Sequence, residues 1–399
     1  MKVFLRKIRS VFILIFKKFS ALFALIQRAS AFIKCLFVGL FKKERKTYIN
    51  DASQKLKEMF PDNASENVGT AFDLPVSKDL SVIIAAYNVE KYVAECLDSI
   101  LNQKTKYSVE IIIVNDGSTD STAEKIKPYL SDDRVKYFEQ ENAGQSSARN
   151  FALKKSVGRY IMVVDSDDVI ADGSIDLLMD AAIKNRADIA EAKTQMFLDK
   201  PMLCAKGRQN VYKPNCKKIA TSVGYSVAKV YKRELWENVC YPVGYIFEDK
   251  INKFVLKRKA EKLVFIDANI YGYRVGIQSS SHSKKEYAFL SSLRVLPKIW
   301  GQCDNNGIKK DKTFYMLSLD HIALLNYVCL KNSDAEIKNL AFSVMQDELN
   351  FIKSSRPKSM PILFRLLDRA IRKGPIEKWQ YLAATVSKYN LLKHYREIN

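Results

Sequence analysis

The chain has 399 residues, of which 47% are hydrophobic and 27% charged, a globular composition long enough for two or three domains. Its net charge of +21 indicates an anionic partner, either nucleic acid or a membrane surface. The seven cysteines are odd in number and form no C-x-x-C pair, so the composition argues against a disulfide-bonded or zinc-binding protein.

Residues 1–46 combine cations with apolar side chains. They hold twelve lysines and arginines against one acid, Glu44, a net charge of +11. No uncharged apolar run approaches the roughly 20 residues that a membrane-spanning helix needs. At 100° per residue, the apolar and basic side chains gather on opposite faces, which predicts a basic amphipathic helix. Such a helix suits an anionic membrane surface and would place the protein peripherally on the cytoplasmic face.

A helix packed on the protein's own core is the alternative for this head. Nucleic acid is not expected as a partner, because the cations concentrate in an apolar segment and no nucleic-acid-binding motif accompanies them. Residues 47–78 follow as a predicted polar linker, since proline, asparagine and glycine interrupt any periodicity there.

From residue 79 the sequence alternates between short β-branched runs and helical periodicity. Strands are predicted at 79–86, 110–114, 135–138 and 160–164, and helices at 91–103 and 145–155. This alternation predicts an α/β fold with a doubly wound, mostly parallel sheet and flanking helices. Tyr87, Asp116 and Asp165 follow strand ends, where such sheets bind ligands. No G-x-G-x-x-G follows the first strand and no Walker loop occurs, which argues against dinucleotide oxidoreductases and P-loop hydrolases.

An acidic cluster, Asp165-Ser166-Asp167-Asp168, comes directly after the fourth predicted strand. Three carboxylates in four residues repel one another unless a cation or hydrogen-bond donors compensate. Mg²⁺ and Mn²⁺ take oxygen ligands and can bridge carboxylates to substrate phosphates. The cluster therefore indicates a site for a divalent metal. A solvated loop with Asp168 as a helix cap is the alternative.

Five segments, in register over about half the chain, resemble the family 2 glycosyltransferases, which have the Rossmann-like GT-A fold. They are 81–103 (SVIIAAYNVEKYVAECLDSILNQ), 110–122 (EIIIVNDGSTDST), 142–150 (NAGQSSARN), 158–168 (GRYIMVVDSDD) and 247–249 (FED). The resemblance implies a nucleotide-sugar-binding half at 79–185 and an acceptor-side half at 186–283. It also implies transfer from a nucleotide sugar, a UDP-sugar in the first instance, to a hydroxyl of a glycan or lipid-linked acceptor in cell-surface polysaccharide or glycoconjugate synthesis.

The resemblance assigns roles to individual residues. Asp249 would be the general base, with Glu248 beside it at the substrate, and one base without a second nucleophile implies inversion at the anomeric carbon. Asp165 and Asp167 would hold Mn²⁺ or Mg²⁺. The other positions implied to bind the donor are Ala85, Tyr87, Asp116 at the nucleobase, Arg149, and Arg274 at the diphosphate. A structural ion pair for Glu248 and a surface location for Arg274 are the alternatives.

Residues 284–399 lie beyond the resemblance and are predicted to be helical and basic, without an assigned chemical role. The chain lacks the Q-x-x-R-W motif of processive polysaccharide synthases, which favours transfer of single sugars. A catalytically inactive, glycan-binding or scaffold protein on the same fold is the alternative function. Retention of Asp116, Asp165, Asp167 and Asp249 favours the enzyme.

Overall fold

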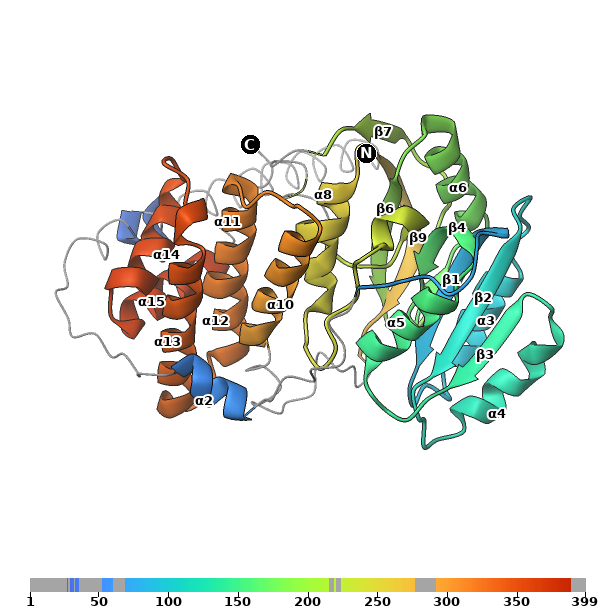
Figure 1. Cartoon of the computed structure of the whole chain (residues 1–399), viewed down its shortest axis with the longest axis horizontal. Coiled ribbons are helices and arrows are strands. Elements are labelled where there is room, and N and C mark those ends of the chain that lie inside the picture. The colour runs from blue at the N-terminus through green and yellow to red at the C-terminus, as the bar shows by residue number, and fades with distance from the viewer. Residues whose placement is uncertain are drawn as a thin grey trace, which may run out of the picture. The chain divides into compact units, whose positions relative to one another are not determined.

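The structure of the chain, a computed structural model, is shown in Figure 1. It describes residues 27, 29–31, 33–35, 52–59, 69–214, 219, 224–276 and 292–388. Two compact units are present, one comprising Met59–Phe314 and the other Met1–Glu58 with Tyr315–Asn399. Within the described ranges, no helix is both long and apolar enough to cross a bilayer. Most of the predicted basic head lies outside the described residues.

The unit Met59–Phe314 is built on a nine-stranded sheet in the order β3-β2-β1-β4-β8-β6-β9-β5, with β7 paired to β9. The strands are β1 (Lys78–Ala86), β2 (Val109–Asn115), β3 (Val135–Glu139), β4 (Gly158–Val163), β5 (Val169–Ile170), β6 (Ile189–Phe197), β7 (Gln209–Tyr212), β8 (Lys229–Lys232) and β9 (Leu263–Arg274). All four strands predicted from the sequence are present, with bounds that differ by at most two residues.

The first four strands pair in parallel, as predicted. The second half of the sheet is mixed, because β8 runs antiparallel to both β4 and β6, whereas β6 and β9 are parallel. The chain passes from β1 through β2 to β3 in one direction and then returns to place β4 on the other side of β1. The carboxyl ends of β1 and β4 therefore flank a topological switch point, where open α/β sheets bind ligands.

Helices cover both faces of this sheet (Figure 1). The helices of this unit are α3 (Val93–Leu101), α4 (Thr122–Ile126), η2 (Lys127–Ser131), α5 (Gln145–Lys155), α6 (Ser174–Asn185), η3 (Arg233–Trp236), η4 (Glu248–Lys250), η5 (Asn252–Leu256), α8 (Lys257–Lys259) and α10 (Ser292–Asn305). Leu80, Val82 and Ile84 alternate onto the face covered by α3 and α6, while α5 packs against β1 and β2. Full burial of each aliphatic side chain contributes about 1.5–3 kcal/mol, so β1 is fixed firmly at the centre.

The boundaries between the units differ from the predicted ones. The predicted C-terminal region begins at residue 284, yet α10 belongs to the sheet unit. Gln302 of α10 explains this, because its amide accepts from the backbone N–H of Cys240 at 3.0 Å and donates to the Cys240 carbonyl at 2.9 Å. The predicted linker, in turn, contains helix α2 (Ala52–Met59). Near the end of the linker, the N–H of Asp73 donates to the carbonyl of Lys154 in the sheet unit.

The unit containing Tyr315–Asn399 is helical, as predicted. Its helices are α11 (Lys312–Asp320, which begins just before the unit), η7 (His321–Leu325), α12 (Asn326–Leu330), α13 (Ala335–Phe351), η8 (Lys353–Ser355), α14 (Ile362–Lys373) and α15 (Ile376–Lys388). Trp379 is buried against Phe342, with ring centroids 5.7 Å apart. From the described part of the head, Ala31 and Cys35 are buried, whereas Ile33 is half exposed. The other described residues of the head, 27, 29, 30 and 34, are exposed.

Candidate active site

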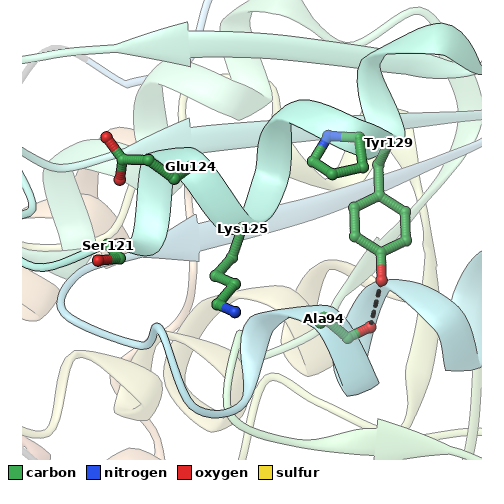
Figure 2. A pocket seen from close by; sticks show the side chains of 6 residues that line it. Ala94, Ser121, Glu124, Lys125 and Tyr129 are labelled. Atoms are coloured by element: carbon green, nitrogen blue, oxygen red, sulfur yellow. Dashed lines mark hydrogen bonds between the residues drawn. The ribbon is translucent and has the colours of Figure 1, made fainter.

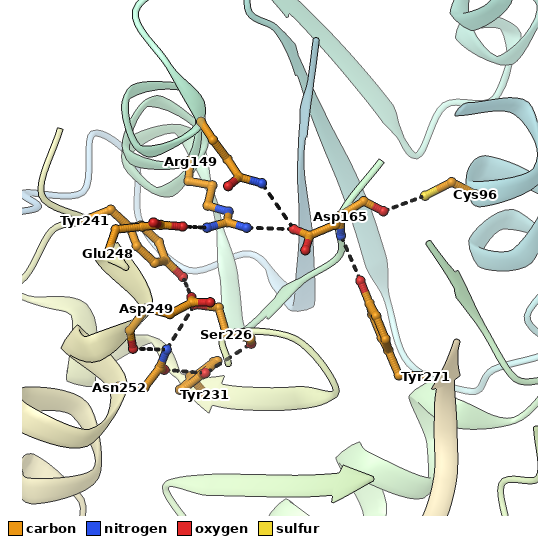
Figure 3. A network of polar contacts seen from close by, with 11 residues as sticks. Cys96, Arg149, Asp165, Ser226, Tyr231, Tyr241, Glu248, Asp249, Asn252 and Tyr271 are labelled. Carbon is orange, nitrogen blue, oxygen red and sulfur yellow. Dashed lines mark hydrogen bonds and ion pairs between the residues drawn. The ribbon is translucent and has the colours of Figure 1, made fainter. Parts of the chain in front are cut away.

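The acidic loop that follows β4 is held by three elements of the fold (Figure 3). Asp165 Oδ1 accepts a hydrogen bond from Arg149 Nη2 of α5 at 2.6 Å. The backbone N–H of Asp165 donates to the Tyr271 hydroxyl of β9 at 3.0 Å. Cys96 of α3 donates its thiol to the Asp165 carbonyl, with an Sγ–O distance of 3.4 Å. The loop is therefore fixed at the carboxyl end of β4, in the crevice at the topological switch point. This disagrees with the alternative of a merely solvated loop.

The next two carboxyl groups are short of positive charge. Asp168 is buried, and its Oδ1 accepts from the backbone N–H of Arg274 at 2.7 Å. Its Oδ2 is buried and makes no hydrogen bond of normal geometry with the residues that the structure describes. Burial, reinforced by the neighbouring carboxylates, raises the pKa of Asp167 to about 6 and that of Asp168 to about 8.

These properties fit a divalent cation. Ionised carboxylates are hard oxygen ligands, and a cation would lower the raised pKa values of the acidic loop. Within the described ranges, no three acidic, histidine or cysteine side chains converge to hold a metal by themselves. Two aspartates would therefore need the oxygens of a substrate diphosphate to complete the coordination of a metal.

Arg149 connects this loop to the second group of acids. Its guanidinium is almost completely buried and pairs through Nη1 with Glu248 Oε1 at 2.9 Å, while Nη2 holds Asp165. The guanidinium also lies 5.2 Å from the centre of the Tyr241 ring. The predicted metal motif and the predicted Glu248-Asp249 pair, 83 residues apart from Asp165 to Glu248, thus share one arginine.

The Glu248-Asp249 pair begins the short helix η4, immediately after Phe247. Phe247 has a φ of +65°, a left-handed conformation that is costly for a bulky side chain and is often found at functional sites. Burial, reinforced by the Asp249 carboxyl, raises the pKa of Glu248 to about 7, and burial also raises the pKa of Asp249. Raised pKa values of this kind are common among groups that exchange protons in active sites.

Asp249 is held by a serine that the sequence gave no reason to select. The Ser226 hydroxyl donates to Asp249 Oδ1. Ser226 Oγ in turn accepts from the Tyr241 hydroxyl at 2.9 Å and from Asn252 Nδ2 at 3.0 Å. A hydroxyl has one proton and two lone pairs, so both lone pairs of Ser226 are used and its proton is directed to Asp249.

Asn252 is oriented just as completely. Its amide donates to the Asp249 carbonyl at 3.0 Å, and its Oδ1 accepts from the Tyr231 hydroxyl at 2.5 Å. Ser226, Tyr231, Tyr241 and Asn252 were all missed by sequence reasoning. They follow no motif spacing, and only the folding of β8 against η4 and η5 brings them together (Figure 3).

The predicted donor-binding residues lie at the same edge of the sheet. Asp116 is buried at the end of β2, and its carboxylate accepts from Gln140 Nε2 at 2.7 Å and from the N–H groups of Ala143 and Gly144 at 2.9 and 2.8 Å. It therefore fixes the loop that leads into α5. Ala85 is half-buried near the end of β1, and Tyr87, just beyond that strand, is 47% exposed.

Arg274, at the end of β9, is a fixed and nearly buried cation, which excludes a surface location. Its Nη2 pairs with Glu95 Oε2 at 2.5 Å, and its Nε donates to the Asp167 carbonyl at 2.8 Å. The guanidinium lies between two rings, 4.8 Å from Tyr92 and 4.6 Å from Phe197. In this structure Arg274 holds the acidic loop through the backbone of Asp167.

A separate surface hollow of about 510 Å³ lies between α3 and the α4–η2 segment (Figure 2). Its lining comprises Ala94, Ser121, Glu124, Lys125, Pro128 and Tyr129. None of these belongs to the acidic network, and the Tyr129 hydroxyl spans its edge by donating to the Ala94 carbonyl at 3.2 Å. The hollow is therefore distinct from the candidate active site.

Comparisons with known proteins identify the family of the chain. The family model described as "Glycosyl transferase family 2" matches residues 81–239, which include four of the five segments singled out above. Glycosyltransferase GlyA of Streptococcus pneumoniae is 33% identical over 217 residues, which are 50% of this chain and 31% of GlyA. Glycosyltransferase GlyG of the same organism is 30% identical over 216 residues, which are 50% of this chain and 71% of GlyG. The chain belongs to glycosyltransferase family 2.

The structural comparison confirms the predicted GT-A-type fold for this family 2 glycosyltransferase. The crystal structure of S. aureus TarS 1–349 in complex with UDP-GlcNAc superposes with a TM-score of 0.61 and covers 78% of this chain and 92% of its own. Sequence identity is 17%, so the likeness concerns the fold. The chain spans about a third of GlyA, and the family match at residues 81–239 lies within the unit Met59–Phe314.

Proposed function

We propose that this glycosyltransferase moves a sugar, with inversion, from a nucleotide sugar to a hydroxyl of a glycan or lipid-linked acceptor in cell-surface polysaccharide or glycoconjugate synthesis. The observation that carries the proposal is the bridge made by Arg149, which sets Asp165 and Glu248 on either side of one guanidinium. The UDP-GlcNAc bound in TarS supports a UDP-sugar as the donor.

The general base in this proposal is Asp249. Glu248 is engaged in an ion pair with Arg149, whereas the side chain of Asp249 forms one hydrogen bond, with the Ser226 hydroxyl, among the residues described. Its second oxygen is thus available to an acceptor hydroxyl. The acceptor oxygen would lose its proton to Asp249 and bond to the anomeric carbon as the bond to the diphosphate breaks with its electron pair. A single displacement of this kind inverts the anomeric centre.

The leaving diphosphate needs positive charge in the same crevice. Asp165 and Asp167 would hold Mn²⁺ or Mg²⁺, which neutralises charge as it develops on the leaving group. Arg274 keeps the acidic loop in place through the Asp167 carbonyl and adds a fixed cation beside it. Ala85, Tyr87 and Asp116 would receive the nucleoside, with the exposed Tyr87 ring offering a stacking surface for the base.

The proposed location is the cytoplasmic face of an anionic membrane, with residues 1–46 as a peripheral anchor. The support is the +11 charge of the head beside its apolar residues. Flotation of the full chain with anionic vesicles, compared with a form that starts at Tyr48, tests the anchor. Equal flotation of the two would remove the head from this role.

The experiment that tests the transfer is a donor screen with the purified full chain. Release of nucleoside diphosphate would be measured for several UDP- and GDP-sugars, each with Mn²⁺, with Mg²⁺ and with excess chelator. The proposal expects release from a UDP-sugar that depends on the metal. No release from any donor, combined with binding of glycans, would instead favour the inactive glycan-binding protein.

A further inference from the structure

The sheet unit exposes three large apolar side chains on one short segment. Met196, Leu198 and Met202 are 67%, 68% and 82% exposed, and we call them the apolar ridge. Met196 and Leu198 alternate with the buried Phe197 at the end of β6, so they point away from the core because Phe197 points into it. Single exposed apolar residues are common, but three within seven positions form a feature that needs an explanation.

The ridge stands on a segment that is tied to the sheet. The N–H of Val275 donates to the Phe197 carbonyl at 2.9 Å, and further along the N–H of Cys204 donates to the Asn269 carbonyl at 2.8 Å. Close packing adds to these bonds, since a Cβ at Gly272 would lie 3.0 Å from the side chains of both Phe197 and Pro201. The exposure of the ridge is therefore built into the fold of β6 and β9.

Cations lie on the same segment as the ridge and on the stretch that follows it. Lys200, Lys206 and Arg208 are exposed, and none forms an ion pair with any residue in the described ranges. Between residues 196 and 213 the only acid is Asp199, against four lysines and arginines. Long basic side chains whose charges are free can reach past neighbouring apolar groups to phosphate oxygens.

We propose that the apolar ridge, with the cations beside it, docks the catalytic unit onto an anionic phospholipid bilayer. Methionine and leucine would enter the boundary between headgroups and acyl chains, while the lysines and arginine contact the headgroups. A soluble glycan would instead require polar and aromatic side chains at the contact. The apolar ridge thus complements the acyl chains of an anionic lipid surface, and the cations without ion-pair partners complement its phosphate groups.

The apolar ridge adjoins the candidate active site through a single side chain, that of Phe197. Phe197, between Met196 and Leu198, stacks on the guanidinium of Arg274, which holds the acidic loop. Docking at the ridge would therefore bring the crevice to the bilayer, where the hydroxyl of a lipid-linked acceptor would be presented. This contact is additional to the predicted head and does not depend on the proposed transfer reaction.

Depth-dependent fluorescence quenching tests the proposal on the full-length protein. Met202→Trp would be mixed with vesicles that contain phosphatidylglycerol and lipids brominated on the acyl chains. The three native tryptophans, Trp236, Trp300 and Trp379, are buried and form a constant background. The matched control is Leu130→Trp, because Leu130 is 42% exposed on η2 beside β3, at the opposite edge of the sheet in Figure 1.

The proposal expects quenching at position 202 to be several times that at position 130, and to weaken with zwitterionic vesicles. The triple change of Met196, Leu198 and Met202 to serine should lower the partition coefficient onto anionic vesicles at least about tenfold, with the melting temperature unchanged. Leu130→Ser should bind like the wild type. No quenching at position 202 while the protein floats, or no flotation at all, would overturn the proposal. Neither result uses turnover, so a failed donor screen leaves this test intact.

Discussion

Replacing Ser226 with alanine removes the one side-chain hydrogen bond that reaches Asp249 among the described residues. A hydrogen bond to a charged acceptor contributes about 1.5–3 kcal/mol, and each pKa unit corresponds to 1.36 kcal/mol. The pKa of Asp249, already raised by burial, should therefore rise by a further one to two units, roughly. The sign is fixed, because the lost bond stabilised the ionised form.

The assay is the pH dependence of kcat/KM for donor turnover by Ser226→Ala. The acidic limb of the profile should move to higher pH by about one to two units, while the rate at high pH approaches that of the wild type. Stability should fall by about 1–3 kcal/mol, since the donors of Tyr241 and Asn252 lose their shared acceptor. Ser121→Ala, at an exposed serine whose hydroxyl makes no cap bond, is the matched control. An acidic limb that stays in place, or moves to lower pH, would refute the reasoning.

Three further predictions concern other parts of the network and the helical unit. Asp167→Asn should nearly abolish turnover while the protein stays folded, as should chelation of divalent ions in the wild type; full activity in excess chelator would contradict the metal site. Arg149→Met leaves two carboxylates without their shared cation and should destabilise the fold by about 3–5 kcal/mol in chemical denaturation at pH 8, which a change below 1 kcal/mol would contradict. Glu348 is buried with both oxygens unpartnered in the described structure, and burial raises its pKa well above the usual value. The wild type should therefore lose stability as the pH rises above about 4.5, and Glu348→Leu should recover about 1–3 kcal/mol at pH 8 by thermal unfolding, whereas Glu336→Leu, at an exposed site on the same helix, should change little.

Local sequence patterns predicted the first half of the sheet, because its strands are buried β-branched runs. The segment around Ile111 to Val114 is apolar at every position, as a strand buried on both faces must be. The end of such a strand also marks the ligand edge, which is why Asp116 and Asp165 could be selected before the structure was known. The mixed half escaped prediction, since the antiparallel placement of β8 depends on pairing between distant segments.

The same limit applies to the active site. The charged residues could be identified from the sequence, because carboxylates clustered near strand ends repel one another and therefore indicate a bound cation or another functional partner. Sequence reasoning missed Ser226 and Asn252, whose roles come from distant contacts with Asp249. It also expected Arg149 and Arg274 to meet the nucleotide, whereas both are seen binding acidic side chains, Asp165 and Glu248 for the first and Glu95 for the second. Whether either reaches a bound donor stays a prediction.

The most direct test of the central claim compares turnover by the wild type and by Asp249→Asn, with donor binding measured alongside by calorimetry. If Asp249 takes the proton of the acceptor, the variant should turn over about 10²–10⁴ times more slowly while it binds the nucleotide sugar with nearly unchanged affinity. Normal turnover by Asp249→Asn, together with loss of turnover in Glu248→Gln, would identify Glu248 as the base. It would contradict the assignment of that role to Asp249, the carboxylate that Ser226 holds.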